Sequence, residues 1–258
     1  MALPILPPSA TSAPRPRHLT PEALTPSSFV TFGTAISPPF ATTLTTPPKT
    51  IPSPLDSTQP KAVFANQNSA LKTSPVSQFA NNYASSPSNR PSTPQMSMFS
   101  CFPRNLSGVG IAKSPSGEVV FRVEILERHP YTTQTFAPLG LARDDPTTVF
   151  LVVVAPSLPG SIIAALPDGT SRSIASPPDL SRLRAFIAKG DQAVTYGPGT
   201  WHAPMVVLGR KRVDFLVTQF VNDVAEDDCQ EVLLGKNGVS VELKNLGLEA
   251  GMAERPKL

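Results

Sequence analysis

The chain has 258 residues, enough for one sizeable domain or two small ones, and its formal net charge is only +3. No run of five or more basic residues occurs, so we expect no nucleic-acid binding, which needs a concentrated basic face. The longest apolar run, Val149–Ala155, is too short to cross a bilayer. Only two cysteines occur, and prolines interrupt the first residues. We therefore expect a cytoplasmic protein with reduced thiols and no membrane partner.

The first hundred residues hold 18 of the 31 prolines, which limits regular structure there because proline fixes φ and removes a backbone donor. We expect a disordered tail over residues 1–17, followed by a short helix or turn that leads into a strand within 18–40. Stretches rich in Pro, Thr and Ser predict flexible inserts near 41–61 and 85–95. Short strands are expected at 62–66 and 96–102. The whole of 18–244 is expected to form one domain, with a C-terminal tail at 245–258.

From Gly117 onward the sequence has the pattern of many short strands. Phe121, Val123 and Ile125 alternate with charged residues, which is typical of a half-buried strand. The valine-rich run 149–155 predicts a strand that is buried on both faces. Further strands are expected at 161–165, 193–196, 205–208, 213–221 and 239–243, with turn sequences among them. Strands at this spacing favour a mainly β barrel or sandwich.

One helix is expected after Ser176. Ser176 is a suitable N-cap and Pro177 suits the first helical position. Four apolar residues then fall on one helical face (Leu180, Leu183, Phe186 and Ile187), and Gly190 could end the helix. The basic residues Arg182, Arg184 and Lys189 would lie on its solvated face.

The chain has three histidines, and two of them lie near turns between expected strands. His129 follows Glu127-Arg128, and His202 follows Gly199-Thr200-Trp201. The third, His18, lies in the proline-rich N-terminal region. Imidazole is suited to acid–base chemistry and to metal binding, but a buried histidine can equally be structural. The residues alone leave both interpretations open.

The two histidine segments resemble degenerate versions of the paired motifs of the cupin superfamily. Gly199 and His202 keep the Gly-x-x-His spacing of the second motif. In the first motif Tyr131 stands where a second histidine is usual, and Gln134 is the polar residue nearest the carboxylate position. The usual shell of three histidines and one glutamate is therefore not available. No cofactor is certain, although His129 and His202 could together help to bind a divalent transition metal.

Longer strings resemble the ureidoglycolate lyase family, also called urea-releasing ureidoglycolate hydrolase, in its fungal form. The resemblance covers about 119–234 strongly, and it extends weakly to 18–40 and to Asn66-Gln67 with Lys72. It implies a cupin-like β-barrel, commonly a homodimer, that acts on ureidoglycolate in allantoin degradation. The matching strings occur in one order: 126–130, 133–138, 178–187, 190–192, 200–204, 219–222 and 226–230.

The implied reaction cleaves ureidoglycolate to glyoxylate and urea. His129 and His202 are then expected to share the acid–base work or to hold a metal jointly. Glu127 is a further acid–base candidate, although a salt bridge between Glu127 and Arg128 is the alternative. Gln134 could bind the ureido group or could be a surface amide at a strand end.

The substrate carboxylate requires a cation. Lys72 is the first candidate, together with Asn66 in the same weak match, and Arg184 is the fallback. Trp201 is a further candidate contact, with a core position as its alternative.

Three other functions compete with the lyase. An amidohydrolase on the same substrate would release ammonia and would normally need an activated metal-bound water. A non-catalytic cupin-like protein would bind a small molecule without turnover. A sugar-processing cupin would also use histidine bases, but the matching strings do not resemble that class.

Overall fold

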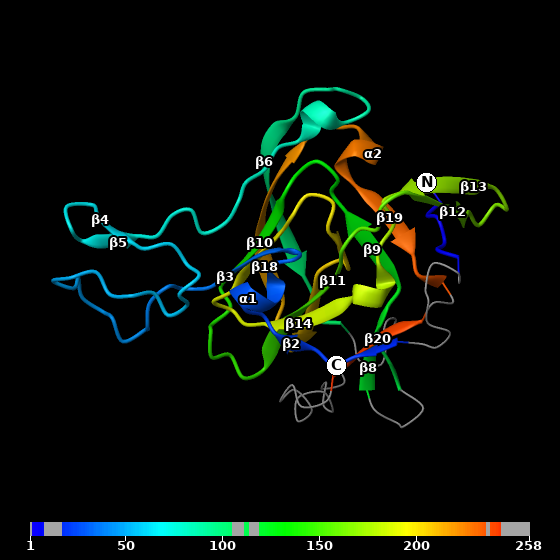
Figure 1. Cartoon of the computed structure of the whole chain (residues 1–258). Helices are drawn as coiled ribbons and strands as arrows, with labels where there is room; N and C mark the ends of the chain where they lie inside the picture. Colours follow the sequence, from blue (N-terminus) through cyan, green and yellow to red (C-terminus); the bar gives the residue numbers. More distant parts are fainter. Residues whose placement is uncertain (1, 8–16, 105–110, 114–118, 236–237, 244–258) are drawn as a thin grey trace.

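The computed structural model describes residues 2–7, 17–104, 111–113, 119–235 and 238–243, and it is mainly β as predicted (Figure 1). The helical elements are single turns: α1 (Pro26–Phe29), η2 (Tyr83–Ser85), η3 (Leu180–Arg182) and α2 (Ala225–Asp228). Within these described ranges, a helix with the length and apolar character to span a membrane does not occur. The expected tail at 245–258 and most of the expected tail at 1–17 lie outside the described residues.

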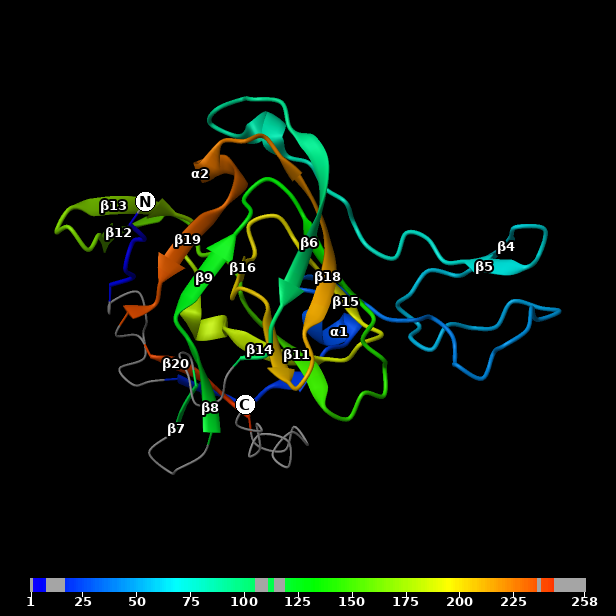
Figure 2. The same ribbon diagram turned by 180° about the vertical axis from the view of Figure 1, so that it is seen from behind.

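Three sheets and two hairpins make up the β structure (Figures 1 and 2). The five-stranded sheet has the order β3 (Gly33–Ile36), β15 (Ala193–Tyr196), β10 (Gln134–Leu139), β18 (Val213–Val221), β6 (Thr93–Cys101). The seven-stranded sheet has the order β19 (Gln230–Leu233), β9 (Ile125–Arg128), β16 (Trp201–His202), β11 (Thr148–Ala155), β14 (Arg184–Ala188), β2 (Glu22–Ala23), with β17 (Val206–Gly209) also paired to β11. The four-stranded sheet has the order β1 (Arg17–Leu19), β20 (Val239–Glu242), β8 (Val119–Val123), β7 (Ile111–Lys113). The hairpins are β12 (Ser161–Ala165) with β13 (Ser171–Ala175), and β4 (Val63–Ala65) with β5 (Ala70–Lys72).

Strand β11 is buried on both faces, as its valine-rich sequence predicts. Val152 and Val154 belong to a core shared with Phe136 and Phe215 of the five-stranded sheet. The alternate residues of β11 enter a second core on the other side, together with Trp201 and residues of β8 and β20. Because fully burying one such side chain stabilises the fold by roughly 1.5–3 kcal/mol, these two cores fix the position of the seven-stranded sheet between its neighbours.

The N-terminal part contains the expected short helix followed by a strand. Thr25 caps α1 by accepting a hydrogen bond from the Ser28 amide (3.1 Å), and Pro26 occupies the first turn. Phe29 at its end is fully buried and lies edge-on to Phe186, with ring centroids 5.4 Å apart. Strand β3 then pairs with β15.

The helix expected after Ser176 is wrong. Only the single turn η3 is helical, capped by Asp179, which accepts from the Ser181 amide (2.9 Å). The chain then extends into β14, which pairs along β11. Leu183, Phe186 and Ile187 mimic a helical apolar stripe because β14 lies in a sheet with cores on both faces. Periodicity alone does not separate such a strand from a helix.

Two N-terminal segments contact the domain where tails or inserts were expected. Near the start of the chain, the amide of Leu6 donates to Leu233 O (2.9 Å), and the Leu6 side chain is buried. Within the expected insert at 85–95, the Ser88 hydroxyl bonds to the Asp227 carboxylate, which also accepts from Asn222 Nδ2 (2.9 Å). This serine-rich segment therefore closes over the end of β18.

Candidate active site

His129 and His202 lie side by side at the ends of two paired strands, β9 and β16. His202 ends β16, which pairs with β9 so that His202 lies opposite Glu127, and His129 follows β9 directly. The centroids of the two imidazole rings are 5.5 Å apart. Both rings are almost fully buried, with residue exposures of 7% for His129 and 1% for His202. The structure thus brings together the three residues predicted to be catalytic.

Backbone carbonyl groups hold one nitrogen of each imidazole. His129 Nδ1 lies 2.6 Å from Asp228 O, and His202 Nδ1 lies 3.1 Å from Thr200 O. A carbonyl oxygen only accepts, so each Nδ1 must carry the hydrogen. The Nε2 atoms of both rings are buried, and neither has a hydrogen-bond partner among the described residues. In the neutral form of either ring, Nε2 then holds the lone pair and can take a substrate proton or bind a metal.

Glu127 interacts with His202 rather than with Arg128. Its Oε1 lies 3.4 Å from His202 Nε2, a distance typical of an ion pair and longer than an ordinary hydrogen bond. The Arg128 side chain points to the opposite face of β9, where it donates to Ala175 O (2.8 Å) and lies over the Trp201 ring. The alternative of a Glu127–Arg128 salt bridge is therefore wrong.

Burial and charge shift the pKa values of this group in different ways. Burial raises the pKa of Glu127, but the contact with His202 and the charges of both histidines outweigh it, so the pKa lies below its ordinary value. Burial, assisted by the charge of His202, lowers the pKa of His129 to about 4. His129 is therefore neutral at pH 7 and able to accept a proton.

The neutral state of His129 predicts a loss of stability in acid. The unfolded imidazole binds its proton near pH 6.5 and the folded one only near pH 4, so the unfolded state takes up more protons in this window. We expect the free energy of unfolding to fall by about 3 kcal/mol from this group between pH 6.5 and pH 4. The depressed pKa of Glu127 acts in the same direction at lower pH. Denaturant titrations at several pH values measure the slope, and His129→Asn should flatten it. An unchanged slope in that variant would contradict the assignment.

Aromatic and amide side chains line the rest of the histidine site. The Tyr196 ring stacks on His202, with centroids 3.9 Å apart and planes 10° from parallel. Gln134 is buried at the start of β10, and its Nε2 donates to Gln219 Oε1 (2.6 Å). The alternative of a surface amide at Gln134 is therefore wrong. Gln134 Oε1 has no partner among the described residues, so it can accept from an N–H of a ligand.

The donor atoms of this site fit a divalent transition metal. Glu127, His129 and His202 each offer one ligand atom, and these three atoms lie within 4.8 Å of one another. Two imidazoles and one carboxylate form a common three-residue metal set. The carbonyl contacts at both Nδ1 atoms orient the rings as the outer contacts of metal-binding histidines usually do. Glu127 thus joins the two histidines as a potential ligand.

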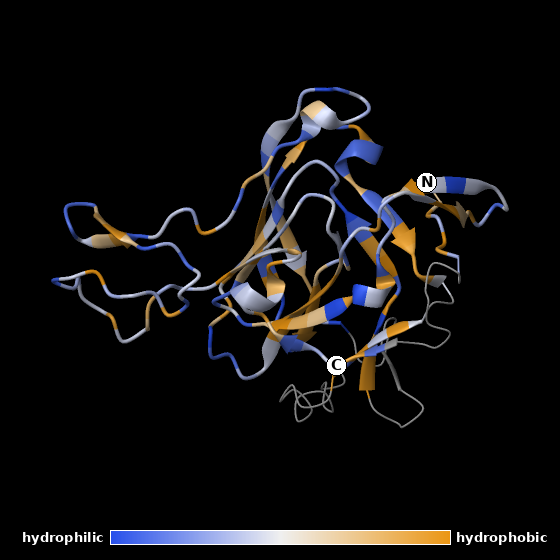
Figure 3. Ribbon diagram, in the orientation of Figure 1, coloured by the Kyte–Doolittle hydropathy of each residue, from blue (hydrophilic) through white to orange (hydrophobic). Residues whose placement is uncertain are grey.

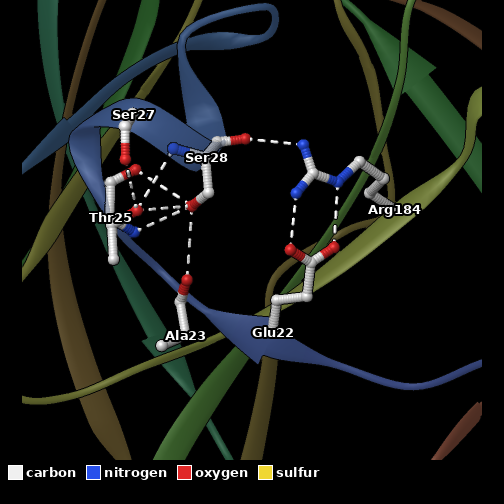
Figure 4. A network of polar contacts seen from close by, with 6 residues as sticks. All are labelled: Glu22, Ala23, Thr25, Ser27, Ser28 and Arg184. Carbon is white, nitrogen blue, oxygen red and sulfur yellow. Dashed lines mark hydrogen bonds and ion pairs between the residues drawn. The ribbon is translucent and has the colours of Figure 1, made fainter.

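Arg184 and Trp201 lie away from the two Nε2 atoms. Figure 4 shows Arg184 paired with Glu22 (Nη2–Oε2, 2.5 Å) and donating to Ser28 O (2.8 Å). Trp201 belongs to the core on the other side of the sheet, where its Nε1 donates to Ser176 O (2.9 Å). Neighbouring residues of a strand point to opposite faces, so Trp201 and His202 enter different environments.

Asn66 and Lys72 lie on the β4–β5 hairpin, which stands clear of the domain in both Figures 1 and 2. This hairpin pairs only with itself. The structure of one chain therefore does not bring these two predicted substrate contacts to the histidines. Their roles stay predictions.

Sequence reasoning missed the residues that orient His129. Asp228 presents its carbonyl to the imidazole, while its carboxylate accepts from the Asn222 amide (2.8 Å) and from the Tyr83 hydroxyl (2.6 Å). The contacts with His129 and Tyr83 join segments distant in sequence, and a backbone carbonyl leaves no residue-type signal. The string 226–230 marked the segment without indicating this role.

Comparison with known proteins decides the family. A family model described as ureidoglycolate lyase matches residues 16–242. The chain belongs to the ureidoglycolate lyase family. The ureidoglycolate lyase of Saccharomyces cerevisiae is 36% identical over 214 residues, which are 81% of this chain and 91% of the yeast protein. The ureidoglycolate lyase of Schizosaccharomyces pombe is 36% identical over 66% of this chain and 76% of its own. A Burkholderia mallei ureidoglycolate lyase is 38% identical over a shorter stretch, 38% of this chain and 42% of its own.

Family membership confirms the resemblance seen in the sequence. The match spans Glu127, His129, Gln134 and His202, and it also spans the β4–β5 hairpin that carries Lys72. The matched range therefore includes every residue that the sequence predicted for the site.

Proposed function

We propose that this protein cleaves ureidoglycolate to glyoxylate and urea in allantoin degradation. The observation that carries the proposal is the pair of buried imidazoles with free Nε2 atoms beside Glu127, in a chain of the ureidoglycolate lyase family. The substrate is a carbinolamide that bears a carboxylate. Its cleavage needs one group to remove the hydroxyl proton and another to protonate the departing nitrogen.

His129 is assigned as the base. Its Nδ1–H is held by Asp228 O, so Nε2 carries the lone pair. Its pKa of about 4 keeps the ring neutral before the reaction. Nε2 takes the hydroxyl proton, the O–H electron pair forms the carbonyl of glyoxylate, and the C–N bond breaks with its electron pair moving to nitrogen.

His202 is assigned as the acid, with Glu127 as its partner. Glu127 Oε1 lies 3.4 Å from Nε2, where it can pair with the imidazolium form of the ring. This imidazolium donates its proton to the departing nitrogen, which leaves as urea. One proton has then moved from substrate oxygen to His129 and another from His202 to urea, so exchange with water restores both rings. Gln134 Oε1 would accept from the ureido N–H groups.

A divalent metal held by Glu127, His129 and His202 would supply Lewis-acid polarisation of a substrate oxygen. It would occupy the same Nε2 lone pairs that the acid–base assignment uses. The two uses therefore differ in their response to metal removal.

Product analysis tests the function. Incubation with racemic ureidoglycolate should release glyoxylate and urea in equal amounts and no ammonia, because the proposed site breaks only the carbinol C–N bond. The same assay after chelator treatment and dialysis separates the two uses of the histidines. Retained activity supports the acid–base pair, and loss that added metal reverses supports the metal.

Two outcomes of this assay favour the other functions. Ammonia in place of urea would indicate an amidohydrolase. Binding of the substrate without any turnover would indicate a non-catalytic cupin-like protein.

We also propose a cytoplasmic homodimer. The homodimer is what the family resemblance implies, and the distribution of exposed apolar side chains supports it. The cytoplasmic location rests on the sparse cysteines of the sequence.

A further inference from the structure

Exposed apolar side chains are concentrated in one part of the chain. Of the 14 large apolar residues that are exposed among the described residues, ten lie between Leu44 and Phe102. Nine of them fall on strand β6 and on the arm, which we define as residues 38–79 and which carries the β4–β5 hairpin, and Phe102 directly follows β6. Figure 3 shows hydrophobic segments on this arm although it stands away from the domain. Large exposed apolar patches mark interaction sites.

The outer face of the five-stranded sheet carries one apolar cross-strand row, beside a row in which Met96 pairs with Thr218 and Thr218 with Thr135. Phe136, Phe215 and Val217 point inward to the core, so the alternate residues of these strands point outward. On that side the cross-strand row is Met98, Leu216 and Ala137. Met96 and Met98 are 75% and 54% exposed. An antiparallel sheet that faces water on one side normally carries polar residues there, so the two exposed methionines at the edge of this face are suited to a partner.

Strand β6 adds an open edge to this face. It ends the order of its sheet over nine residues, Thr93–Cys101, with β18 on one side only. Unpaired edges of this length readily pair with another chain. The open edge of β6 and the exposed methionines on its outer face therefore belong to one surface.

The hairpin of the arm has an unusual tip. Asn66, Gln67 and Asn68 are consecutive non-glycine residues with positive φ angles of 49°, 56° and 66°. Asparagine tolerates this backbone in turns, so the three residues form a tight tip to the hairpin. Lys72 ends β5 and is exposed. The arm holds three lysines and one aspartate, so it is basic.

The histidine site, in contrast, is bonded to no cation in the described part of the chain. Glu127 pairs with His202, and the imidazoles are held by backbone carbonyl groups. Arg128 points to the other face of the sheet, and Arg184 is paired with Glu22. The carboxylate of the proposed substrate still needs a positive partner.

We propose that two copies of this chain pack through the apolar outer face at β6, and that the arm of each copy carries Lys72 to the histidine site of the other. This inference rests on the proposed function. In a two-fold dimer each copy uses the same surface, so both arms exchange. Lys72 binds the substrate carboxylate.

The available area and the reach of the arm are sufficient. Half-exposed side chains of this size offer about 100 Å² each, so ten offer about 1,000 Å², close to the ~800 Å² per partner of a stable interface. Ala80, whose amide bonds to Thr133 Oγ1, anchors the arm near β10. Ala80 lies eight positions after Lys72, and at about 3.3 Å per position this segment spans up to about 26 Å.

Complementation between two variants tests this arrangement. Lys72→Ala should lower kcat/KM by roughly 10–150-fold, because it removes a charged hydrogen bond, and His202→Asn should remove activity. When the two variants are co-expressed with different tags, each heterodimer should hold one site with both residues intact. An equal mixture should therefore recover about a quarter of the wild-type rate. Lys49→Ala, another exposed arm lysine, is the matched control for Lys72→Ala.

The purified heterodimer decides the outcome. If it shows no more activity than the sum of its parents, Lys72 acts within its own chain or not at all, and the inference is overturned. Wild-type turnover is measured first, so absence of lyase activity would bear on the proposed function instead. A double variant, Met96→Glu with Met98→Glu, should be a folded monomer by light scattering and thermal unfolding. If that variant is still a dimer, the two copies do not pack through the outer face at β6, and this part of the inference is wrong.

Discussion

His202→Asn is expected to lower kcat/KM for ureidoglycolate by about 10²–10⁴-fold, the usual effect of losing one general acid or base. Asparagine keeps a polar side chain but has no titratable nitrogen to protonate the departing urea. Nor can it replace the imidazole as a ligand, so the loss is expected for either use of the site. Initial rates of glyoxylate release measure the effect.

The third histidine provides a matched control for this variant. His18 lies on β1, where its Nδ1 contacts Ser240 Oγ (2.8 Å), in a sheet apart from the histidine site. His18→Asn should therefore retain wild-type kinetics. His202→Asn should remain folded, with a loss of roughly 0.5–3 kcal/mol, because it removes the ring that stacks on Tyr196. A His202→Asn protein that releases urea at the wild-type rate would disprove the catalytic assignment.

Much of the β structure could be predicted because its signal is local. The alternation at 121–125 and the apolar run at 149–155 appear as β8 and β11. The helix expected after Ser176 shows where local signals fail. Its apolar spacing arises from β14 lying between two cores, and those cores are formed by residues far away in sequence. The hydrogen bonds of β14 to β11 override the local helical preference.

The candidate site was predictable in its residue types but not in its pairing. The sequence placed His129 and His202 near turns, and the fold brings their rings within 5.5 Å. The sequence left it open whether Glu127 acts in catalysis or forms a salt bridge with Arg128. Glu127 lies opposite His202 because of the register between β9 and β16, and this register cannot be read from the sequence. The tautomer of His129 depends on a carbonyl of α2, and backbone groups are invisible to motif reasoning.

Trp201→Ala is expected to cost about 3–5 kcal/mol of unfolding free energy, the largest stability effect among the predicted site residues. The side chain is fully buried beneath the Arg128 guanidinium, and its Nε1 donates to Ser176 O. Truncation leaves a large cavity in the core between the seven-stranded and four-stranded sheets. At about 2–4 °C per kcal/mol for a chain of this size, the melting temperature should fall by roughly 6–20 °C.

Trp201→Phe separates packing from substrate contact. Phenylalanine fills most of the cavity and removes one of the two hydrogen bonds that Ser176 O accepts, the other coming from Arg128 Nη1 (3.0 Å). A smaller loss of about 0.5–1.5 kcal/mol is therefore expected. Because Trp201 and His202 point to opposite faces of β16, KM should be unchanged in the folded variant. A tenfold rise in KM with unchanged stability would instead show that the indole contacts the substrate. Unfolding and kinetics measured on the same preparation therefore decide between a core role and a binding role for Trp201.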